Sequence, residues 1–246
     1  MFSGYCADDK WKKTQKSSFR KPVLSPPLFP GVWVFNNGRL FGSQTDPRLL
    51  VGFASSDSFR DGIPVHTTCS ADIDEKEIRM EKPEELVVAL AHAKADAILE
   101  KMAKNGMMQE IADSQETTLL ITADQVVVHD GVIREKPTTP EEARKFIQGY
   151  SQSHAATIGS VLVTDVKNGS RRGGWDKSEV YFHKIPDEVI DSLIEEGNVF
   201  YVAGGLLVEH PLTSPLVESI VGTMDSVMGL PKALTEKLIK DSLQES

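Results

Sequence analysis

The chain has 246 residues, of which 40% are hydrophobic and 26% charged, and its formal net charge is −9. This length and apolar content are enough for one large α/β domain or two small ones. The acidic balance argues against a nucleic-acid-binding protein, which needs a basic face to neutralise phosphates. Cys6 and Cys69 are the only cysteines, so the sequence supports neither a disulfide framework nor a structural zinc site.

No apolar segment reaches the roughly 18 residues needed to cross a bilayer, and the first residues lack the apolar core of a signal peptide. We therefore expect a cytoplasmic protein without a membrane or nucleic-acid partner.

Residues 1–47 differ in kind from the rest of the chain. They hold seven lysines and arginines against three aspartates, a surplus of +4 that leaves −13 for the remainder. Five prolines interrupt any regular pattern there. We expect a poorly ordered or divergent N-terminal extension over residues 1–47 and a folded domain over 48–246. Organellar targeting by the extension stays open, although Asp8 and Asp9 are unusual for a transit peptide.

From residue 48 onward, apolar strands alternate with amphipathic helices, a pattern typical of an α/β domain with a mixed or parallel sheet. We expect strands over residues 49–54 and 65–69. A helix should begin at Pro83, because proline fits a first helical turn and the acids after it favour the positive end of the helix dipole. This helix should run to about Lys104.

Next comes an apolar strand around residues 119–128, which Asp124 interrupts. Asp130-Gly131 after it predicts a tight hairpin turn, with Val132 and Ile133 in the returning arm.

The segment Thr139-Pro140-Glu141-Glu142 is a capping box that starts a helix over residues 141–148, so Lys136 lies just before a helix. Further strands are expected over 156–165 and 178–184, joined by a turn-rich segment at 167–174. A helix over 186–196 should end at Gly197, and a last helix should follow Pro231.

Two of these positions point to chemistry. A carboxylate such as Asp124 inside an apolar strand must face a polar cleft, a cation or a hydrogen-bonding partner, to offset the cost of its dehydration. The alternative is an aspartate at a strand end held by backbone amides. Lys94 falls on the side of its helix expected to be buried, where an ammonium needs an anion. The alternative is a lysine at the edge of that side whose ammonium extends to solvent.

Three further residues are weak signals individually. Glu75 stands in an acidic cluster after an expected strand, where carboxylates often hold divalent cations. A solvated acidic face is the alternative. Lys136 could be a surface lysine, and Gln125 could bond to a neighbouring strand. Together, carboxylates and lysines around one cleft would suit a Mg²⁺-dependent enzyme that acts on a polyphosphate.

Three segments carry a resemblance to a known family: SADIDEKEIRMEKPEELVVALAHAKA, ITADQVVVHDGVIREKPTTPEEARKFI and VEHPLTSPLVESIVGTMDSVMGLPKALTEKL. They resemble the Maf family of nucleoside triphosphate pyrophosphatases, also called septum formation proteins, and the eukaryotic, plant-like branch in particular. The matching motifs are an Asp-Glu pair, A-x-x-K-A on the first long helix, Asp124-Gln125 near Lys136-Pro137, and G-L-P before the last helix. The resemblance covers residues 62–240.

The resemblance implies an α/β fold like that of the inosine triphosphatases, with a mixed sheet, helices and two lobes around a central cleft. It implies hydrolysis of the α–β phosphoanhydride of normal or modified nucleoside triphosphates to a monophosphate and pyrophosphate, as a house-cleaning activity. It also implies a Mg²⁺ or Mn²⁺ cofactor and a homodimer.

Residue by residue, Asp124 matches the family's essential aspartate, which is a base for the attacking water or a metal ligand. Glu75 matches an acid assigned to the metal or water. Lys94 and Lys136 match lysines expected on the triphosphate. Gln125 matches a position that is glutamine in members preferring 7-methyl-GTP and threonine in members preferring dTTP and UTP.

The sequence departs from the family before the second expected strand. There the family has S-x-S-x-R-R leading into a helix, whose N-terminus cradles phosphate. Ser55 and Arg60 align with its first serine and second arginine as substrate-binding residues, but Phe59 replaces the first arginine and Asp57 adds negative charge. We expect the helix itself to be missing, because only Asp61 separates Arg60 from Gly62-Ile63-Pro64. The alternative function is therefore a catalytically impaired nucleotide-binding or interaction protein.

Overall fold

A computed structural model describes residues 32–37, 49–53, 71, 73–113 and 117–244. The strand expected over 65–69 lies outside these ranges. So do Ser55, Arg60 and the segment from which a family helix is expected to be missing.

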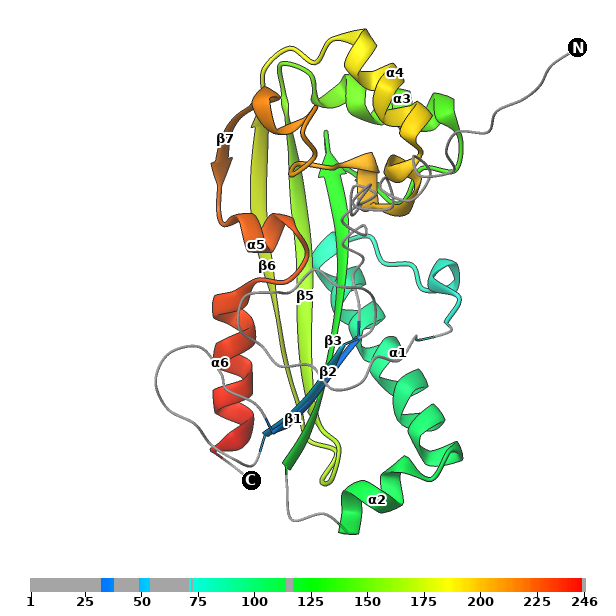
Figure 1. Ribbon diagram of the computed structural model, residues 1–246, viewed down its shortest axis with the longest axis vertical. Coiled ribbons are helices and arrows are strands. Elements are labelled where there is room, and N and C mark those ends of the chain that lie inside the picture. Colours follow the sequence, from blue (N-terminus) through cyan, green and yellow to red (C-terminus); the bar gives the residue numbers. More distant parts are fainter. Residues whose placement is uncertain (1–31, 38–48, 54–70, 72, 114–116, 245–246) are drawn as a thin grey trace, which may run out of the picture.

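The described strands form one seven-stranded sheet (Figure 1). Its order is β1-β2-β3-β5-β6-β7, and β4 pairs with β3 as a short branch. Only β2 and β3 pair in parallel, so the mixed sheet expected from the sequence is confirmed. The strands are β1 (Val32–Asn37), β2 (Leu49–Phe53), β3 (Thr117–His129), β4 (Val132–Arg134), β5 (His154–Asp165), β6 (Arg171–Phe182) and β7 (Val217–Val221).

Helices cover both faces of this sheet and one of its ends. In Figure 1, α1 and α6 flank the lower part of the sheet, while α3 and α4 pack together at the top. The helices are α1 (Pro83–Lys104), α2 (Met107–Asp113), α3 (Pro140–Tyr150), α4 (Asp187–Glu196), α5 (Met224–Val227) and α6 (Lys232–Leu243). Short 3₁₀ turns are η1 (Glu75–Glu77), η2 (Asn198–Tyr201), η3 (Ala203–Gly205) and η4 (Ser214–Leu216).

Several boundaries agree with the local sequence signals. Helix α1 begins at Pro83 and ends at Lys104, and α6 follows Pro231. Helix α4 ends at Gly197, whose φ of 79° is the left-handed conformation that glycine adopts easily. The expected hairpin is present too, because β4 pairs back onto β3 after Asp130-Gly131, and both turn residues have positive φ.

Three strands differ from the sequence-based expectation, and one of them, β7, was not expected at all. β6 begins at Arg171, inside the segment expected to be a turn, because Gly173 and Gly174 serve close packing there. A Cβ at Gly173 would lie 3.1 Å from a methyl of Leu162, and one at Gly174 would lie 3.0 Å from a methyl of Leu234 on α6. β1 lies within residues 1–47, for which the proline pattern predicted no strand; its Val-Trp-Val-Phe run has high β propensity.

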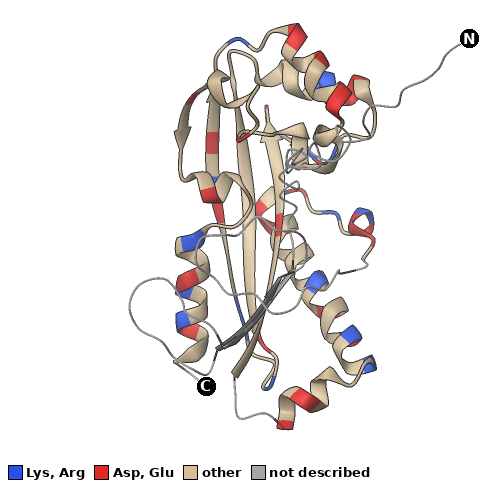
Figure 2. Cartoon of the chain, in the orientation of Figure 1, with Lys and Arg blue, Asp and Glu red and all other residues tan. Residues whose placement is uncertain are grey.

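The long strand β3 presents alternate residues to opposite faces of the sheet. Leu119, Ile121 and Ala123 pack with α6, whereas Leu120 packs with α1. Its buried positions are nearly continuous, as expected for a strand covered on both faces. Figure 2 accordingly shows the central strands mostly without charge, while basic and acidic residues lie along α1 and α6. Within the described part of the chain, no helix is long and apolar enough to cross a membrane.

The centre of β3 has a described strand on one side only. β1 pairs with β3 up to Thr122, and β4 pairs with it from Val127 onward. Between these points, residues 123–126 pair with β5 alone among the described strands. Asp124 and Gln125, whose side chains point to opposite faces of the sheet, stand within this stretch.

Candidate active site

Three charged side chains from separate segments meet at the centre of β3. The Lys94 ammonium on α1 lies 2.5 Å from Asp124 Oδ1 on β3 and 2.9 Å from Glu75 Oε1 on η1. The Lys94 and Asp124 side chains are each only 5% exposed, whereas that of Glu75 is 42% exposed. One buried ammonium thus bridges two carboxylates that are far apart in the sequence.

Buried hydroxyls fix α1 against the sheet and thereby set the position of Lys94. Thr122 Oγ1 donates to the carbonyl of Ala91, and Ser160 Oγ donates to the carbonyl of Val87, each at 2.7 Å. Ser160 is also the β5 partner of Asp124 in the ladder. The two hydrogen bonds therefore hold the helix beside the strand on which the aspartate stands.

Burial and ion pairing act in opposite directions on the pKa values of these three groups. Burial raises the pKa of Asp124 to about 6, although the nearby Lys94 ammonium acts to lower it. Partial burial also acts to raise the pKa of Glu75, but attraction to Lys94 outweighs it and leaves that pKa lowered. Burial would lower the pKa of Lys94, yet the two carboxylates keep it raised. Lys94 therefore stays charged at neutral pH.

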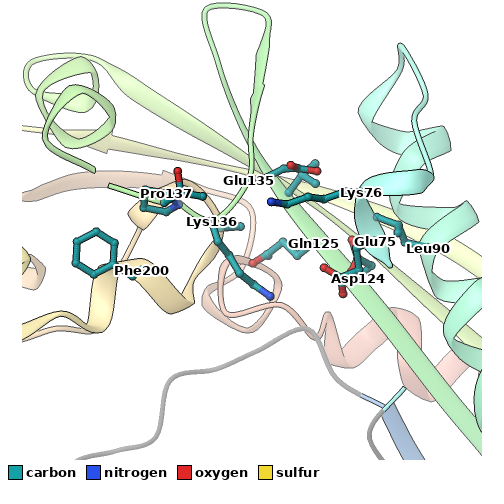
Figure 3. A pocket seen from close by; sticks show the side chains of 12 residues that line it. Glu75, Lys76, Leu90, Asp124, Gln125, Glu135, Lys136, Pro137 and Phe200 are labelled. Carbon is teal, nitrogen blue, oxygen red and sulfur yellow. The ribbon is translucent and has the colours of Figure 1, made fainter. Parts of the chain in front are cut away.

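A cavity of about 270 Å³ extends from this cluster toward Phe200 of η2 (Figure 3). Glu75 and Asp124 lie at one end of it, and Phe200 lies at the other. Lys136, an exposed residue of the loop after β4, reaches into the space between them in Figure 3. Its charge is close enough to favour the ionised forms of both carboxylates. The lining residues are Glu75, Lys76, Leu90, Asp124, Gln125, Val126, Glu135, Lys136, Pro137, Thr138, Phe200 and Ala203.

The cavity wall combines η1, α1 and the centre of β3 on one side with the loop after β4, η2 and η3 on the other, in keeping with the expected two lobes around a cleft. Arg79 connects η1 with the loop after β4, because its guanidinium donates to the carbonyl of Glu75 and to the carboxylate of Glu135, both at 3.2 Å. Glu135 in turn accepts the backbone N–H of Gly204 through its carbonyl, at 2.9 Å. These bonds link η1, the loop after β4 and the η3 turn around one opening.

Gln125 is held in a single orientation by the backbone of α5. Its Nε2 donates to the carbonyl oxygens of Ser226 at 2.9 Å and Val227 at 3.1 Å. Both amide hydrogens are thereby used, so only the Oε1 acceptor can serve a ligand. Gln125 also borders a second, smaller cavity, which is lined by the exposed carboxylate of Glu209 as well.

The residues present fit a divalent cation that arrives with a phosphate ligand. Among the described residues, no group of three or more His, Cys, Asp or Glu side chains could hold a metal ion unaided. Glu75 and Asp124 nevertheless face the cavity together. Mg²⁺ is commonly held by one or two carboxylates plus substrate phosphates and water, and this donor set is of that kind.

The structure adds residues that the sequence reading did not single out. Lys76, Glu135 and Phe200 line the cavity, and Arg79 fastens its two sides. Glu135 and Lys76 adjoin predicted site residues in the sequence, so proximity could have suggested them. Phe200 and Glu209 had no such signal, since they follow α4, far from any of the predicted residues along the chain.

Comparison with known proteins places these features in context. A family model described as "Maf-like protein" matches residues 58–242. A 7-methyl-GTP pyrophosphatase of Dictyostelium discoideum is 38% identical over 180 residues, which are 73% of this chain and 88% of that protein. A dTTP/UTP pyrophosphatase of Halalkalibacterium halodurans is 30% identical over 71% of this chain and 83% of its own length. A dTTP/UTP pyrophosphatase of Porphyromonas gingivalis is 32% identical over 65% of this chain and 74% of its own length.

Proposed function

Because the chain belongs to the Maf-like protein family, we propose that it is a nucleoside triphosphate pyrophosphatase. It hydrolyses the α–β phosphoanhydride and releases a nucleoside monophosphate and pyrophosphate. The observation that carries this proposal is the pair of carboxylates, Glu75 and Asp124, at one end of a cavity that also contains Lys136. Such a cavity offers groups for water, metal and phosphate within one space.

Asp124 is the group best suited to handle the attacking water. With a pKa of about 6, it is largely ionised at neutral pH and still basic enough to accept a proton. The water oxygen would bond to the α-phosphorus as the bond to the β-phosphate oxygen breaks, and pyrophosphate would leave with the electron pair. Lys136 would bind the triphosphate and offset charge that moves onto this leaving group.

Glu75 and Asp124 are the residues that would hold a divalent cation, Mg²⁺ or Mn²⁺. When bound, the metal supplies positive charge to the phosphate oxygens and lowers the pKa of bound water. Glu75 suits this task because its pKa is lowered, so it carries its charge across the neutral range.

The preferred base is 7-methylguanine. Gln125 can offer only a hydrogen-bond acceptor, because Ser226 and Val227 take up its donors. The edge of guanine carries N–H donors, and methylation at N7 gives the base a positive charge that suits the neighbouring carboxylate of Glu209. The similar protein from Dictyostelium discoideum is a 7-methyl-GTP pyrophosphatase, in agreement with this choice.

A panel of nucleoside triphosphates tests the proposal. Pyrophosphate release is measured with Mg²⁺ and with Mn²⁺ for 7-methyl-GTP, GTP, dTTP, UTP and ATP. We expect turnover that is fastest with 7-methyl-GTP. The Asp124→Asn variant should lose on the order of 10²-fold or more in rate. A wild-type chain that releases no pyrophosphate from any nucleotide would overturn the enzymatic function.

That outcome would favour the second candidate, a nucleotide-binding protein without turnover. The observation in its favour is the sequence itself, in which Phe59 stands where the family's phosphate cradle has an arginine. Equilibrium binding of the same nucleotides, measured beside their turnover, separates the two functions.

A further inference from the structure

On the basis of the function proposed above, we propose that Lys94 is a positioning residue. Its ammonium holds the carboxylates of Glu75 and Asp124 from the interior of the protein and does not itself bind the triphosphate. This differs from the role that the family resemblance implies for a lysine at this position. With Lys94 in this role, Lys136 is the lysine that binds the triphosphate of the substrate.

The placement of the three side chains carries this assignment. Both carboxylates line the cavity, whereas Lys94 does not, and its side chain is 95% buried. The ammonium lies 2.9 Å from Glu75 and 2.5 Å from Asp124. An ammonium has three N–H donors, and two of them are directed at these carboxylates. The carboxylates therefore stand between Lys94 and any ligand in the cavity.

Leaving the carboxylates for a phosphate would cost Lys94 both of its ion pairs. Asp124 would then be a buried charge without its partner, which is strongly unfavourable. Lys136, by contrast, is exposed, and its side chain already extends into the cavity (Figure 3). The phosphate of a substrate can reach Lys136 without breaking the buried pair.

Lys94 also sets the charge that a metal meets. Two carboxylates and one ammonium carry a net charge of −1, where the carboxylates alone would carry −2. A divalent cation is attracted less strongly to a site with a charge of −1 than to one with a charge of −2. Lys94 thus keeps the site from binding metal tightly until a triphosphate contributes further oxygen ligands.

The first experiment measures metal binding without nucleotide. Free Mn²⁺ is followed by electron paramagnetic resonance in the wild-type protein and in Lys94→Met, Lys136→Met and Lys104→Met. At a pH high enough to ionise Asp124 without Lys94, we expect Lys94→Met to bind Mn²⁺ about tenfold or more tightly, because it removes the neighbouring positive charge. Lys104→Met is the matched control, since Lys104 is exposed on the same helix and pairs with Glu100. It should leave the affinity unchanged, and Lys136→Met should have a smaller effect.

The second experiment separates positioning from substrate binding. Lys94→Met should lower kcat by about 10²-fold while KM for the triphosphate changes less than about threefold. Lys136→Met should raise KM by about tenfold or more. An unchanged Mn²⁺ affinity in Lys94→Met, or a rise in KM equal to that of Lys136→Met, would overturn the assignment.

A measurement on the wild-type protein covers the case in which Lys94→Met does not fold. Nitrogen-15 NMR of the lysine ammonium groups is recorded as a non-hydrolysable triphosphate analogue is added without metal. The signal of Lys94 should stay in place and that of Lys136 should move. A large shift of the Lys94 signal would contradict the assignment.

These results are distinguishable from failure of the proposed function. A protein that releases pyrophosphate but moves Lys94 onto the phosphates would refute the positioning role alone. A protein without turnover whose Lys94→Met variant binds Mn²⁺ more tightly would refute the enzymatic function alone.

Discussion

At the scale of single residues, the site depends on how burial changes the behaviour of ionisable groups. Asp124 and Lys94 would each be unfavourable alone in the core, and they are tolerated because each is the other's partner. Glu75 adds a second carboxylate at the edge, where solvent and the cavity reach it. Burial of the Asp124 carboxylate is unfavourable for stability. It also raises the pKa of Asp124 toward neutrality, which suits a general base.

Asp124 should make the stability of the metal-free protein depend on pH. Its pKa is raised to about 6 in the folded chain from 3.8, so the folded state holds a proton between these values that the unfolded state has lost. Stability from this group is therefore present below about pH 4 and is lost as pH rises through 6, by about 3 kcal/mol.

Urea unfolding of the wild-type and Asp124→Asn proteins between pH 4 and pH 8 measures this effect. The difference in unfolding free energy should shift in favour of the variant as pH rises. A difference that is constant over this range would show that Asp124 has an ordinary pKa.

Gln125 should determine the base that is preferred. Gln125→Thr has too short a side chain to keep both hydrogen bonds to the α5 carbonyls, and it removes the amide acceptor. We expect kcat/KM for 7-methyl-GTP to fall by roughly 10- to 100-fold, with a much smaller change for dTTP. Equal losses for the two nucleotides would mean that Gln125 serves the fold and not base recognition.

At the scale of elements, the site lies where β3 has a described neighbour on one side only. β1 pairs with β3 up to Thr122 and β4 pairs with it from Val127 onward, so among the described strands residues 123–126 pair with β5 alone. Asp124 and Gln125 can then work together although their side chains leave the strand in opposite directions. The hairpin turn at Asp130-Gly131 brings the loop with Lys136 back to the same opening.

The η3 turn closes the cavity from the other end, and Gly204 is the residue that permits it. Gly204 has a φ of 62°, and a Cβ there would lie 2.6 Å from Tyr150 Oη and 2.7 Å from Val127 Cβ. Gly204→Ala should destabilise the protein by roughly 3 kcal/mol or more, since it combines overpacking with backbone strain.

The matched control is Gly131→Ala. Gly131 has a similar φ of 73°, but no atom of the described residues lies within 4 Å of the position of its Cβ. This variant should lose only about 1 kcal/mol. Equal destabilisation of the two variants in chemical unfolding would show that the close contacts at Gly204 are not what matters.

At the scale of the whole molecule, the cavity joins two separately packed cores. One apolar core lies among α3, α4 and the 3₁₀ turns at the top of the sheet, and another, which includes Leu90 and Val126 of the cavity wall, lies between the start of α1 and the sheet. Arg79 ties the two parts at the opening through Glu135. A ligand that fills the cavity would contact both, so its binding energy would couple them.

Hydrogen exchange measures this coupling. A non-hydrolysable 7-methyl-GTP analogue with Mg²⁺, at about 100 times its Kd, should stabilise the folded state by about 2.7 kcal/mol. Amide protection should rise both in η1 and α1 and in residues 198–205. Protection confined to one of these regions would mean that the nucleotide binds to one side of the cavity only.

The sequence by itself determined the identity of the chemical groups and those elements that carry a local signal. Pro83, Gly197 and Asp130-Gly131 carry local signals, because capping and turn preferences depend on a few adjacent residues, and the structure confirms those elements. Local sequence signals could not predict that Gly173-Gly174 belong to a strand. The residues that these glycines contact, Leu162 and Leu234, are not their neighbours in the chain.

Only the tertiary structure decided how those groups are arranged. A helical pattern identified Lys94 as buried, but not that its partners would be Asp124 and Glu75 instead of a phosphate. The pairing of residues 123–126 with β5 and the orientation of Gln125 depend on β5 and α5, which are remote in sequence. Burial and charge pairing depend on distances in space, and no local pattern of residues specifies them.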